Sequence, residues 1–362
     1  MNYNDKSKSA LDIPSGGGRF NRLVISVLLA SVFIIGPALQ NEAISQEIRA
    51  GRIVDPLEQE KTVVWDVYGE FAIRGLNIHQ ASLRAMLQTG IKKVTGIEDP
   101  NQAWHSIIQA DDIVALKFTS IGSRRLGTNT TIAQVLLQEL YKVGFGPKNF
   151  MIVGIDPEYL PEEAAGTIPC QYGWQKKPVD FLGDRDHLVK WVDQVTAIIN
   201  IPTFLDDNII GLRGALANLS LDMVKRPARL YVNQCDPFIA EIYQLPQIRS
   251  RVRLHIANSL RILYHGGPEI RQIYTCEHSS LIFSKDPVAL DVVGLHLIRR
   301  ARRTQLMPAN VPEHIEAAYL DTAAALGLGF TDLNLIDYRY LKHEKWSKSN
   351  SQSPGKVADS KN

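Results

Sequence analysis

The chain has 362 residues, of which 45% are apolar and 22% are charged, and its 40 Lys and Arg nearly balance its 38 Asp and Glu. This balance argues against a protein that binds nucleic acid through a large basic field. The apolar content excludes wholesale disorder. Three cysteines are too few for a disulfide-rich scaffold, and their spacing matches no metal or iron–sulfur motif.

Residues 23–39 form a run of 17 uncharged, mostly apolar residues. Basic residues precede the run and acidic residues follow it, which predicts that residues 1–22 stay in the cytoplasm and that the globular part is exported. The run is slightly short for a membrane span, and its polar lead is long for a signal peptide. It is therefore either a cleaved signal peptide or an uncleaved anchor in the cytoplasmic membrane.

The rest of the chain divides into three parts by composition. Residues 40–60 are mixed and charged, as in a linker, and residues 61–342 carry the patterns of a folded domain. Residues 343–362 are rich in Ser, Lys and Gly and predict a disordered tail.

Strands and helices are predicted to alternate along residues 61–342. Short β-branched or apolar runs predict strands at 62–68, 113–116, 150–153, 200–204, 253–257 and 279–283. Helical spacing and capping signals predict helices at 81–93, 131–143, 188–199, 212–224, 237–243, 286–300 and 312–326. This order predicts an α/β fold with a mainly parallel sheet flanked by helices. In such sheets ligands bind at the carboxyl ends of the strands, so a site is expected in the loops there.

The loop at 120–130 follows a buried strand and leads into a helix. Backbone N–H groups at a helix start favour an anion, and Arg124 and Arg125 would add positive charge. The spacing from Gly122 to Gly127 resembles the start of a P-loop, but a Thr follows where that motif has Lys, so a nucleotide is poorly supported. The alternative is an ordinary capped turn with solvated arginines.

Three further positions are candidates for ligand binding. Lys117 ends the strand before this loop, where it could hold a substrate or phosphate or could be a surface side chain. Asp207, within the run Asp206-Asp207-Asn208, could serve a cation or acid–base chemistry, or could belong to a polar turn. Asp291 lies one turn inside an apolar helix capped by Asp286, where it needs a partner, so it is either a site residue or part of a structural salt link.

Cys276 and His278 would face the same side of a strand, with Glu277 between them. Because no second ligand pair is close in sequence, a core thiol and a surface imidazole are favoured over a metal site. In an exported protein two of the three cysteines could pair, but nothing in the sequence identifies which two.

Several segments together resemble the bacterial family called domain of unknown function 362, over about residues 60–340. They are Ala103-Trp104 with Asp111 to Lys117, Asn200-Ile201-Pro202 with Gly211 and Ala217-Asn218-Leu219, Gly266-Gly267-Pro268, Ser284 to Asp291, and Gly327-Leu328-Gly329. Each piece is weak alone, but together they keep the family's order. Some basic positions of the family are replaced, and Thr119 stands where members usually carry Asn.

The resemblance implies a ligand cleft but no established reaction. Its residues would be Lys117, Thr119, Gly122, Arg124, Arg125, Gly127, Asp207, Asn218, Gly266, Gly267 and Asp291. We expect an enzyme-like site for a small anionic or metal-linked ligand. The alternative is a non-catalytic accessory or binding protein of the cell envelope, which the lost basic positions favour. Family members are often linked to iron–sulfur domains, which implies a redox protein as a possible partner.

Overall fold

The computed structural model describes residues 61–121, 123–305 and 316–343. The predicted export segment and linker lie outside these residues, and so does the predicted tail except for its first residue, His343, which belongs to a strand. None of the helices that the structure describes is both long and apolar enough to cross a membrane.

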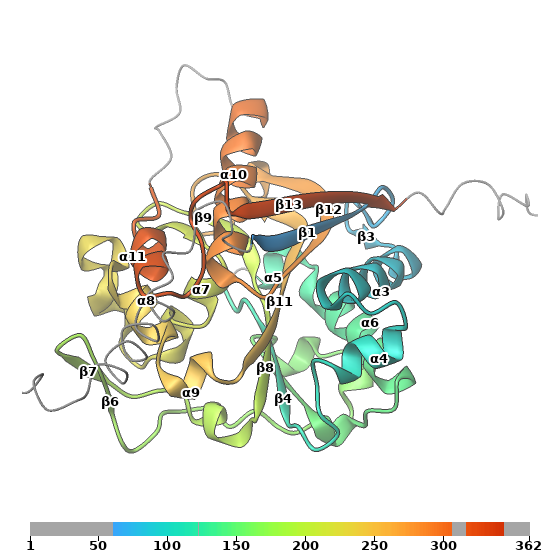
Figure 1. Cartoon of the computed structure of the whole chain (residues 1–362), viewed down its shortest axis with the longest axis horizontal. Coiled ribbons are helices and arrows are strands. Elements are labelled where there is room, and N and C mark those ends of the chain that lie inside the picture. The colour runs from blue at the N-terminus through green and yellow to red at the C-terminus, as the bar shows by residue number, and fades with distance from the viewer. Residues whose placement is uncertain (1–60, 122, 306–315, 344–362) are drawn as a thin grey trace, which may run out of the picture. The chain divides into compact units, whose positions relative to one another are not determined.

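Nine strands form one mixed, mostly parallel sheet (Figure 1). They are β1 (Thr62–Gly69), β4 (Val114–Phe118), β5 (Phe150–Val153), β8 (Ala197–Ile201), β9 (Thr203–Asp207), β10 (Gly211–Arg213), β11 (Val252–Leu263), β12 (Thr275–Ser284) and β13 (Ile336–His343). The spatial order is β13-β1-β12-β11-β8-β4-β5, and β9 pairs with both β11 and β10. Only the pairs β1–β12, β11–β12 and β9–β10 are antiparallel. The prediction of an α/β fold with a mostly parallel sheet is confirmed.

Two short hairpins lie outside the large sheet. They are β2 (Ile73–Arg74) with β3 (Asn77–Ile78), and β6 (Val179–Phe181) with β7 (Asp184–Asp186).

Helices cover both faces of the sheet (Figure 1). One face carries α3 (Gln80–Thr95), α4 (Pro100–His105) and α6 (Asn129–Lys142), and the other carries α7 (Ala215–Asn218), α8 (Phe238–Tyr243), α10 (Pro287–Gln305) and α11 (Tyr319–Ala325). The short helices α5 (Ser123–Leu126) and α9 (Pro246–Arg249) lie in connections. Alternate residues of β4 belong to different cores, since Leu116 packs with the first group and Ala115 with the second. Burial on both faces explains why the central strands are continuous apolar runs.

Two predicted helices are wrong. Residues 188–199 contain a 3-10 turn, Lys190–Gln194, followed by β8. Ile198 and Ile199 face opposite cores, so both faces of this strand are buried. Its continuous apolar residues cannot be told from those of a buried helix by their spacing. Residues 212–224 divide into β10, α7 and a 3-10 turn. The backbone of Gly214, at φ −131° and ψ −147°, is not helical and separates β10 from α7.

The C-terminal part differs from the prediction in two ways. The helix predicted at 312–326 begins at Tyr319, and residues 312–315 lie outside the described part. Strand β13 was missed, although its apolar and polar residues alternate in part. It pairs in parallel with β1 over eight residues, from Thr62 and Ile336 to Gly69 and His343. This pairing brings the two ends of the described domain together.

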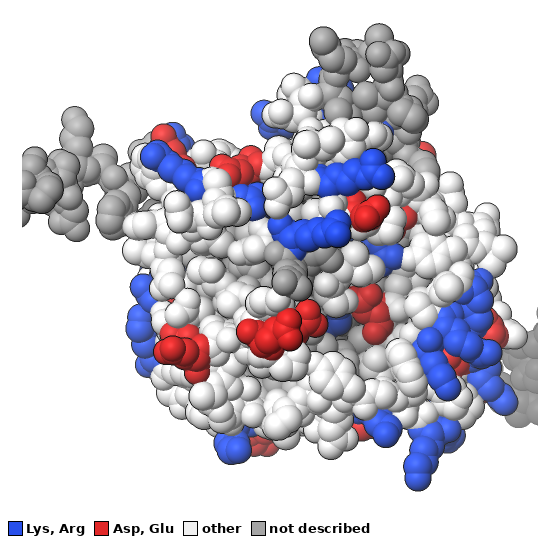
Figure 2. Space-filling model, turned by 180° about the vertical axis from the view of Figure 1, so that it is seen from behind, with Lys and Arg blue, Asp and Glu red and all other residues white. Residues whose placement is uncertain are grey.

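The surface carries charges of both signs. Figure 2 shows one face, on which basic and acidic side chains are interspersed and neither sign covers the whole face. This pattern agrees with the near balance of charges in the sequence.

Candidate functional site

A row of buried polar residues crosses the centre of the sheet at one register. Lys117 on β4 is opposite Asn200 on β8, Asn200 is opposite His255 on β11, and His255 is opposite Ser284 on β12. Each of the four side chains is nearly or fully buried. Residues opposite each other share a face of the sheet, which here is the face under α7, α8 and α10. The row therefore places polar chemistry inside an apolar layer.

The ammonium group of Lys117 has three hydrogen-bond acceptors. Nζ donates to the carbonyl oxygen of Phe118 at 2.8 Å, to Oδ1 of Asn218 at 2.9 Å and to Oδ2 of Asp222 at 3.0 Å. Lys117 is only 2% exposed, so this charge depends on these partners for its stability. An ammonium group has three donors, and all three are used.

Asp222 connects this buried charge to the surface. Its side chain is 16% exposed, and its Oδ2 also accepts a hydrogen bond from the hydroxyl of Ser120 at 2.9 Å. Burial raises the pKa of Asp222, but the Lys117 ammonium, its hydrogen bond and the charge of Arg213 outweigh burial, so the pKa lies below its ordinary value. Asp222 is therefore an ionised carboxylate beside two cations.

The second of these cations belongs to a compact cluster at the end of β9 and β10. Arg213 Nε donates to Oδ2 of Asp207 at 2.9 Å, and its Nη2 donates to the hydroxyl of Tyr231. The other oxygen of Asp207 accepts the backbone N–H groups of Ile209 and Ile210 at 2.9 and 3.1 Å. Asp207 thus closes the β9–β10 turn and fixes the guanidinium in place.

Hydrogen bonds connect the side chains of the polar row from Asn218 to Tyr243. Asn218 Nδ2 donates to Oδ1 of Asn200 at 2.7 Å, and Asn200 Nδ2 donates to the carbonyl oxygen of Ala215 at 2.9 Å. His255 lies 3.0 Å from Asn200 and 3.2 Å from the hydroxyl of Tyr243. Burial lowers the pKa of His255 to about 3, so its imidazole is neutral at physiological pH.

The structure describes the predicted loop at 120–130 only in part. Gly122 lies outside the described residues, and the structure does not describe the side chain of Arg124. Arg125 donates to the carbonyl oxygen of Ile270 at 2.9 Å, which holds the loop against a neighbouring segment. Gly127 has φ +69°, a conformation that glycine adopts at low cost, and it ends α5.

The start of α6 is tied to the interior of the protein. Asn258 Nδ2 donates to Thr128 Oγ1 at 2.7 Å and to Asn129 Oδ1 at 2.8 Å. Thr119 Oγ1 accepts the backbone N–H of Thr203 at 2.9 Å, and its carbonyl oxygen accepts Asn129 Nδ2 at 3.2 Å. These side chains join β4, β9, β11 and α6 and serve as internal links.

Gly266 and Gly267 lie against the end of β9. The backbone N–H of Gly267 donates to Asp206 Oδ2 at 3.2 Å, and its carbonyl oxygen accepts the N–H of Asn208 at 3.1 Å. A Cβ atom on Gly267 would overlap the carbonyl oxygen of Asp206. Gly266 has φ +78°, and Asp206 also pairs with Arg302 at 3.2 Å. The acidic run and the glycine pair, predicted separately, therefore meet.

Asp291 is a fully buried residue of α10, and its carboxylate lies at the start of α7. Its carboxylate accepts the backbone N–H groups of Ala215 and Leu216, the second at 3.0 Å. A Cβ atom on Gly214 would overlap this carboxylate, so glycine is required for the approach. Burial raises the pKa of Asp291 to about 7 despite these hydrogen bonds. Asp291 holds the helix that carries Asn218, and the structure shows no bond from it to Lys117.

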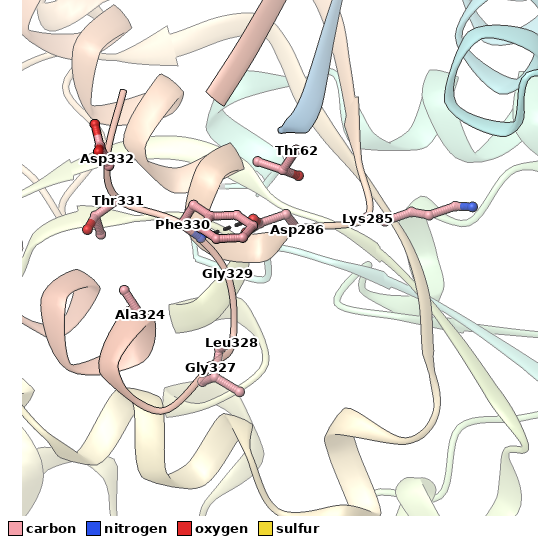
Figure 3. Close-up of a pocket in the computed structure, with 10 residues that line it drawn as sticks. All are labelled: Thr62, Lys285, Asp286, Ala324, Gly327, Leu328, Gly329, Phe330, Thr331 and Asp332. Carbon is pink, nitrogen blue, oxygen red and sulfur yellow. Dashed lines mark hydrogen bonds between the residues drawn. The ribbon is translucent and has the colours of Figure 1, made fainter. Parts of the chain in front are cut away.

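Asp286 caps α10 and lies in a pocket of about 520 Å³ (Figure 3). Its carboxylate accepts the N–H of Ala289 at 2.8 Å and that of Phe330 at 3.1 Å. Gly329 has no room for a side chain beside this carboxylate. In Figure 3 the Asp286 side chain points toward Phe330, and Lys285 points away from both. Asp286 thus joins the start of α10 to the Gly-Leu-Gly segment.

His278 has a carboxylate partner that the sequence did not suggest. Its Nε2 lies 3.1 Å from Oδ2 of the buried Asp66 on β1. Cys276, Cys170 and Cys235 are all free thiols. Within the described residues, no three or more His, Cys, Asp or Glu side chains gather in a way that could hold a metal ion.

The structure brings Lys117 and Asn218, two of the predicted site residues, into direct contact. The predicted site residues do not include Asp222, Arg213, Asn200 or His255, although Asn200 belongs to a segment that carries the family resemblance. Asp222 could have been found from the sequence, because it follows Asn218 by four residues in a mostly apolar segment. Asn200 and His255 are recognised through the cross-strand register, and Arg213 through its ion pair with Asp207.

This site belongs to an α/β protein in which a polar row passes under the helices of one face. No model of a known protein family matches the chain, and no curated protein matches it. The resemblance to the family called domain of unknown function 362 therefore stays a prediction.

Proposed function

We propose that the region at the carboxyl end of β4, around Lys117, Arg213 and Asp222, binds a small anionic ligand. The observation that carries the proposal is the buried ammonium of Lys117. Its only ion-pair partner among the described residues is Asp222, which is partly exposed. A buried charge needs a counter-charge, but that counter-charge can be supplied by a ligand as well as by a side chain.

The charges around Asp222 support an exchange of this kind. Lys117 and Arg213 are balanced by Asp222 and Asp207, and the oxygens of Asp207 are occupied by Arg213 and the β9–β10 turn. Ser120 beside Asp222 is exposed, so an oxyanion can approach from that side. If the carboxylate of Asp222 turns away, a ligand oxyanion that replaces it preserves the local charge balance and gains charge-assisted hydrogen bonds.

The test uses Asp222→Asn, which keeps the shape of the side chain and removes its charge. Thermal unfolding is followed in phosphate, sulfate or acetate at constant ionic strength, with chloride as the reference. We expect the variant to melt below the wild type in chloride, and one of the oxyanions to raise its melting temperature saturably. The matched control is Asp111→Asn, since Asp111 is exposed and no cation pairs with it in the described structure.

Two outcomes contradict the proposal. The first is that no oxyanion stabilises Asp222→Asn more than it stabilises Asp111→Asn. The second is a rise that grows linearly with salt and never saturates, because general salt effects behave in this way.

One observation favours the non-catalytic alternative. The polar row from Lys117 to Tyr243 is hydrogen-bonded to itself, and its members lack the exposed nucleophile that covalent catalysis needs. We therefore propose ligand binding as the function of the site, with no assigned reaction.

We further propose that binding takes place outside the cytoplasm, on the basis of the apolar run at residues 23–39 and its charged flanks. Fusions of a reporter enzyme that is active only after export test this directly. Activity is expected when the reporter follows the folded domain of the full chain. It should be lost when residues 23–39 are deleted. Reporter activity that survives the deletion would contradict export through this segment.

A further inference from the structure

A second cavity, of about 630 Å³, lies at the opposite end of the sheet. Its walls come from β1, β11, β12, β13 and the C-terminal half of α10, and Figure 1 shows β1 and β13 running side by side near α10. It is lined by Tyr68, Ile262, Cys276, Glu277, His278, Leu297, Arg300, Ala301, Thr304, Gln305, Tyr338 and Tyr340. Four strand steps separate β1 from β4, about 19 Å at the usual strand spacing. The cavity is therefore distinct from the site at Lys117.

A buried carboxylate fixes two rings of this cavity. Asp66 is fully buried, and its Oδ2 accepts the hydroxyl of Tyr338 at 2.6 Å and lies 3.1 Å from His278 Nε2. A carboxylate oxygen that accepts the Tyr338 hydroxyl can also accept an imidazole N–H, which makes His278 Nε2 the donor of this contact. The other oxygen, Oδ1, has no hydrogen-bond partner among the described residues. Asp66 thus positions one imidazole and one phenol.

Aromatic rings form one wall of the cavity. The rings of Tyr68 and Tyr340 lie 5.8 Å apart at an angle of 34°, and Tyr340 is 50% exposed. Leu297 and Ala301 of α10 are buried and contribute apolar surface. A planar ring can pack against such a wall, because offset and tilted aromatic pairs are favourable at this separation.

Arg300 is the one Lys or Arg side chain among the residues that line the cavity. Arg300 is exposed, and within the described structure no ion pair engages it. Arg300 and Tyr340 both line the cavity, and burial raises the pKa of Tyr340 while the charge of Arg300 acts in the opposite direction. The carboxylate of Glu277 accepts the N–H of Gly75 at 2.8 Å and pairs with Arg261 at 3.5 Å, so it is already neutralised.

The thiol in this cavity is not activated. Burial raises the pKa of Cys276 to about 11, and no nearby positive charge offsets the effect. It is therefore protonated at neutral pH, and a thiolate–imidazolium pair with His278 is not formed. These groups indicate a binding pocket with aromatic walls and a single cationic group.

We propose that this cavity binds a small aromatic carboxylate, with its ring against Tyr68 and Tyr340 and its carboxylate at Arg300. The volume lies within the range of about 300–1,000 Å³ that is usual for small-molecule pockets. His278 and Thr304 supply further polar contacts at the wall. The proposal is independent of the oxyanion site, since the two share no residue.

The experiment is calorimetric titration of the full-length protein with benzoate. We expect saturable binding at one site per chain, and binding at least about tenfold weaker in Arg300→Gln, because a charge-assisted hydrogen bond contributes on this order. The matched control is Arg303→Gln on the same helix. Arg303 is exposed and does not line the cavity, so this variant should bind as the wild type does.

Two further comparisons test the aromatic wall and the choice of site. Tyr340→Leu should weaken benzoate more than it weakens cyclohexanecarboxylate, which has the same charge but no aromatic ring. Asp222→Asn should leave benzoate binding unchanged, which separates this cavity from the oxyanion site. The proposal is overturned if benzoate does not bind saturably, or if Arg300→Gln and Arg303→Gln weaken it equally.

Discussion

Lys117 and Asn218 are 101 residues apart in the chain, and the Lys117 ammonium donates a 2.9 Å hydrogen bond to the amide oxygen of Asn218. The bond joins the end of a central strand to the short helix α7 that covers it. Asn218 also donates to Asn200 and to the carbonyl oxygen of Lys117. One amide thus connects the cation to the rest of the polar row.

Asn218→Ala should therefore destabilise the protein. The substitution leaves Lys117 with two acceptors and removes the donor that satisfies Oδ1 of Asn200, so a loss of about 2–3 kcal/mol in the free energy of unfolding is expected. Urea unfolding measures it. The control is Asn208→Ala, whose exposed side chain should cost less than about 0.5 kcal/mol. Equal losses in the two variants would mean that the polar row contributes nothing to stability.

The pH dependence of stability should carry a contribution from Asp291. Its pKa is raised by burial to about 7, above the ordinary value of 3.8, so the folded state holds a proton that the unfolded state releases. The stabilisation is complete below about pH 4 and is lost as the pH rises to about 7, at up to about 1.4 kcal/mol per unit.

The measurement is urea unfolding at several pH values between 4 and 7 for the wild type and Asp291→Asn. The variant should lack the fall in the free energy of unfolding that Asp291 causes as the pH rises. Its free energy of unfolding should therefore have a more positive slope against pH than that of the wild type. Asp321→Asn, at an exposed position, is the control. Parallel pH curves for the wild type and Asp291→Asn would refute the assignment.

His255 should contribute in the opposite direction. Burial lowers its pKa to about 3, below the ordinary value of 6.5, so the unfolded state binds a proton that the folded state excludes. Stability from this group is complete above about pH 6.5 and is lost on acidification toward pH 3. In His255→Gln the slope between pH 4 and 6.5 should become more negative than in the wild type. An unchanged slope would show that the imidazole titrates normally in the folded protein.

The contact between Gly267 and Asp206 leads to a steric prediction. A methyl group at position 267 would overlap the carbonyl oxygen of Asp206, so Gly267→Ala should cost about 1–3 kcal/mol. Gly146→Ala is the matched control, because its Cβ would meet nothing closer than 4.0 Å. Thermal unfolding of the two variants tests the difference. If Gly267→Ala melts no lower than Gly146→Ala, the glycine is not required for this approach.

Much of the fold was predictable from local patterns. The strands at 62–68, 113–116 and 150–153 and the helices at 81–93 and 131–143 agree with β1, β4, β5, α3 and α6 to within a few residues. These elements carry strong signals, such as continuous apolar runs or helical spacing. The region 188–224 was mispredicted, because its short, doubly buried elements have no distinctive period.

The candidate site was predictable only in part. Lys117 and Asn218 were identified from the sequence, but Arg213, Asn200 and His255 were not. Hydrogen bonds between residues far apart in sequence depend on which strands are neighbours and on their register. The cavity beside Asp66 was not predicted from the sequence, because its walls come from segments at both ends of the domain.

The sequence by itself determined the α/β class of the domain, most of its strands and a polar position at the end of β4. It determined these because apolar periodicity, capping residues and strand ends are local features. Only the tertiary structure decided that Asp222 neutralises Lys117, that Asp291 holds α7 and that Asp66 positions His278. Those partners are chosen by the order of the strands and by burial, which depend on the whole chain at once.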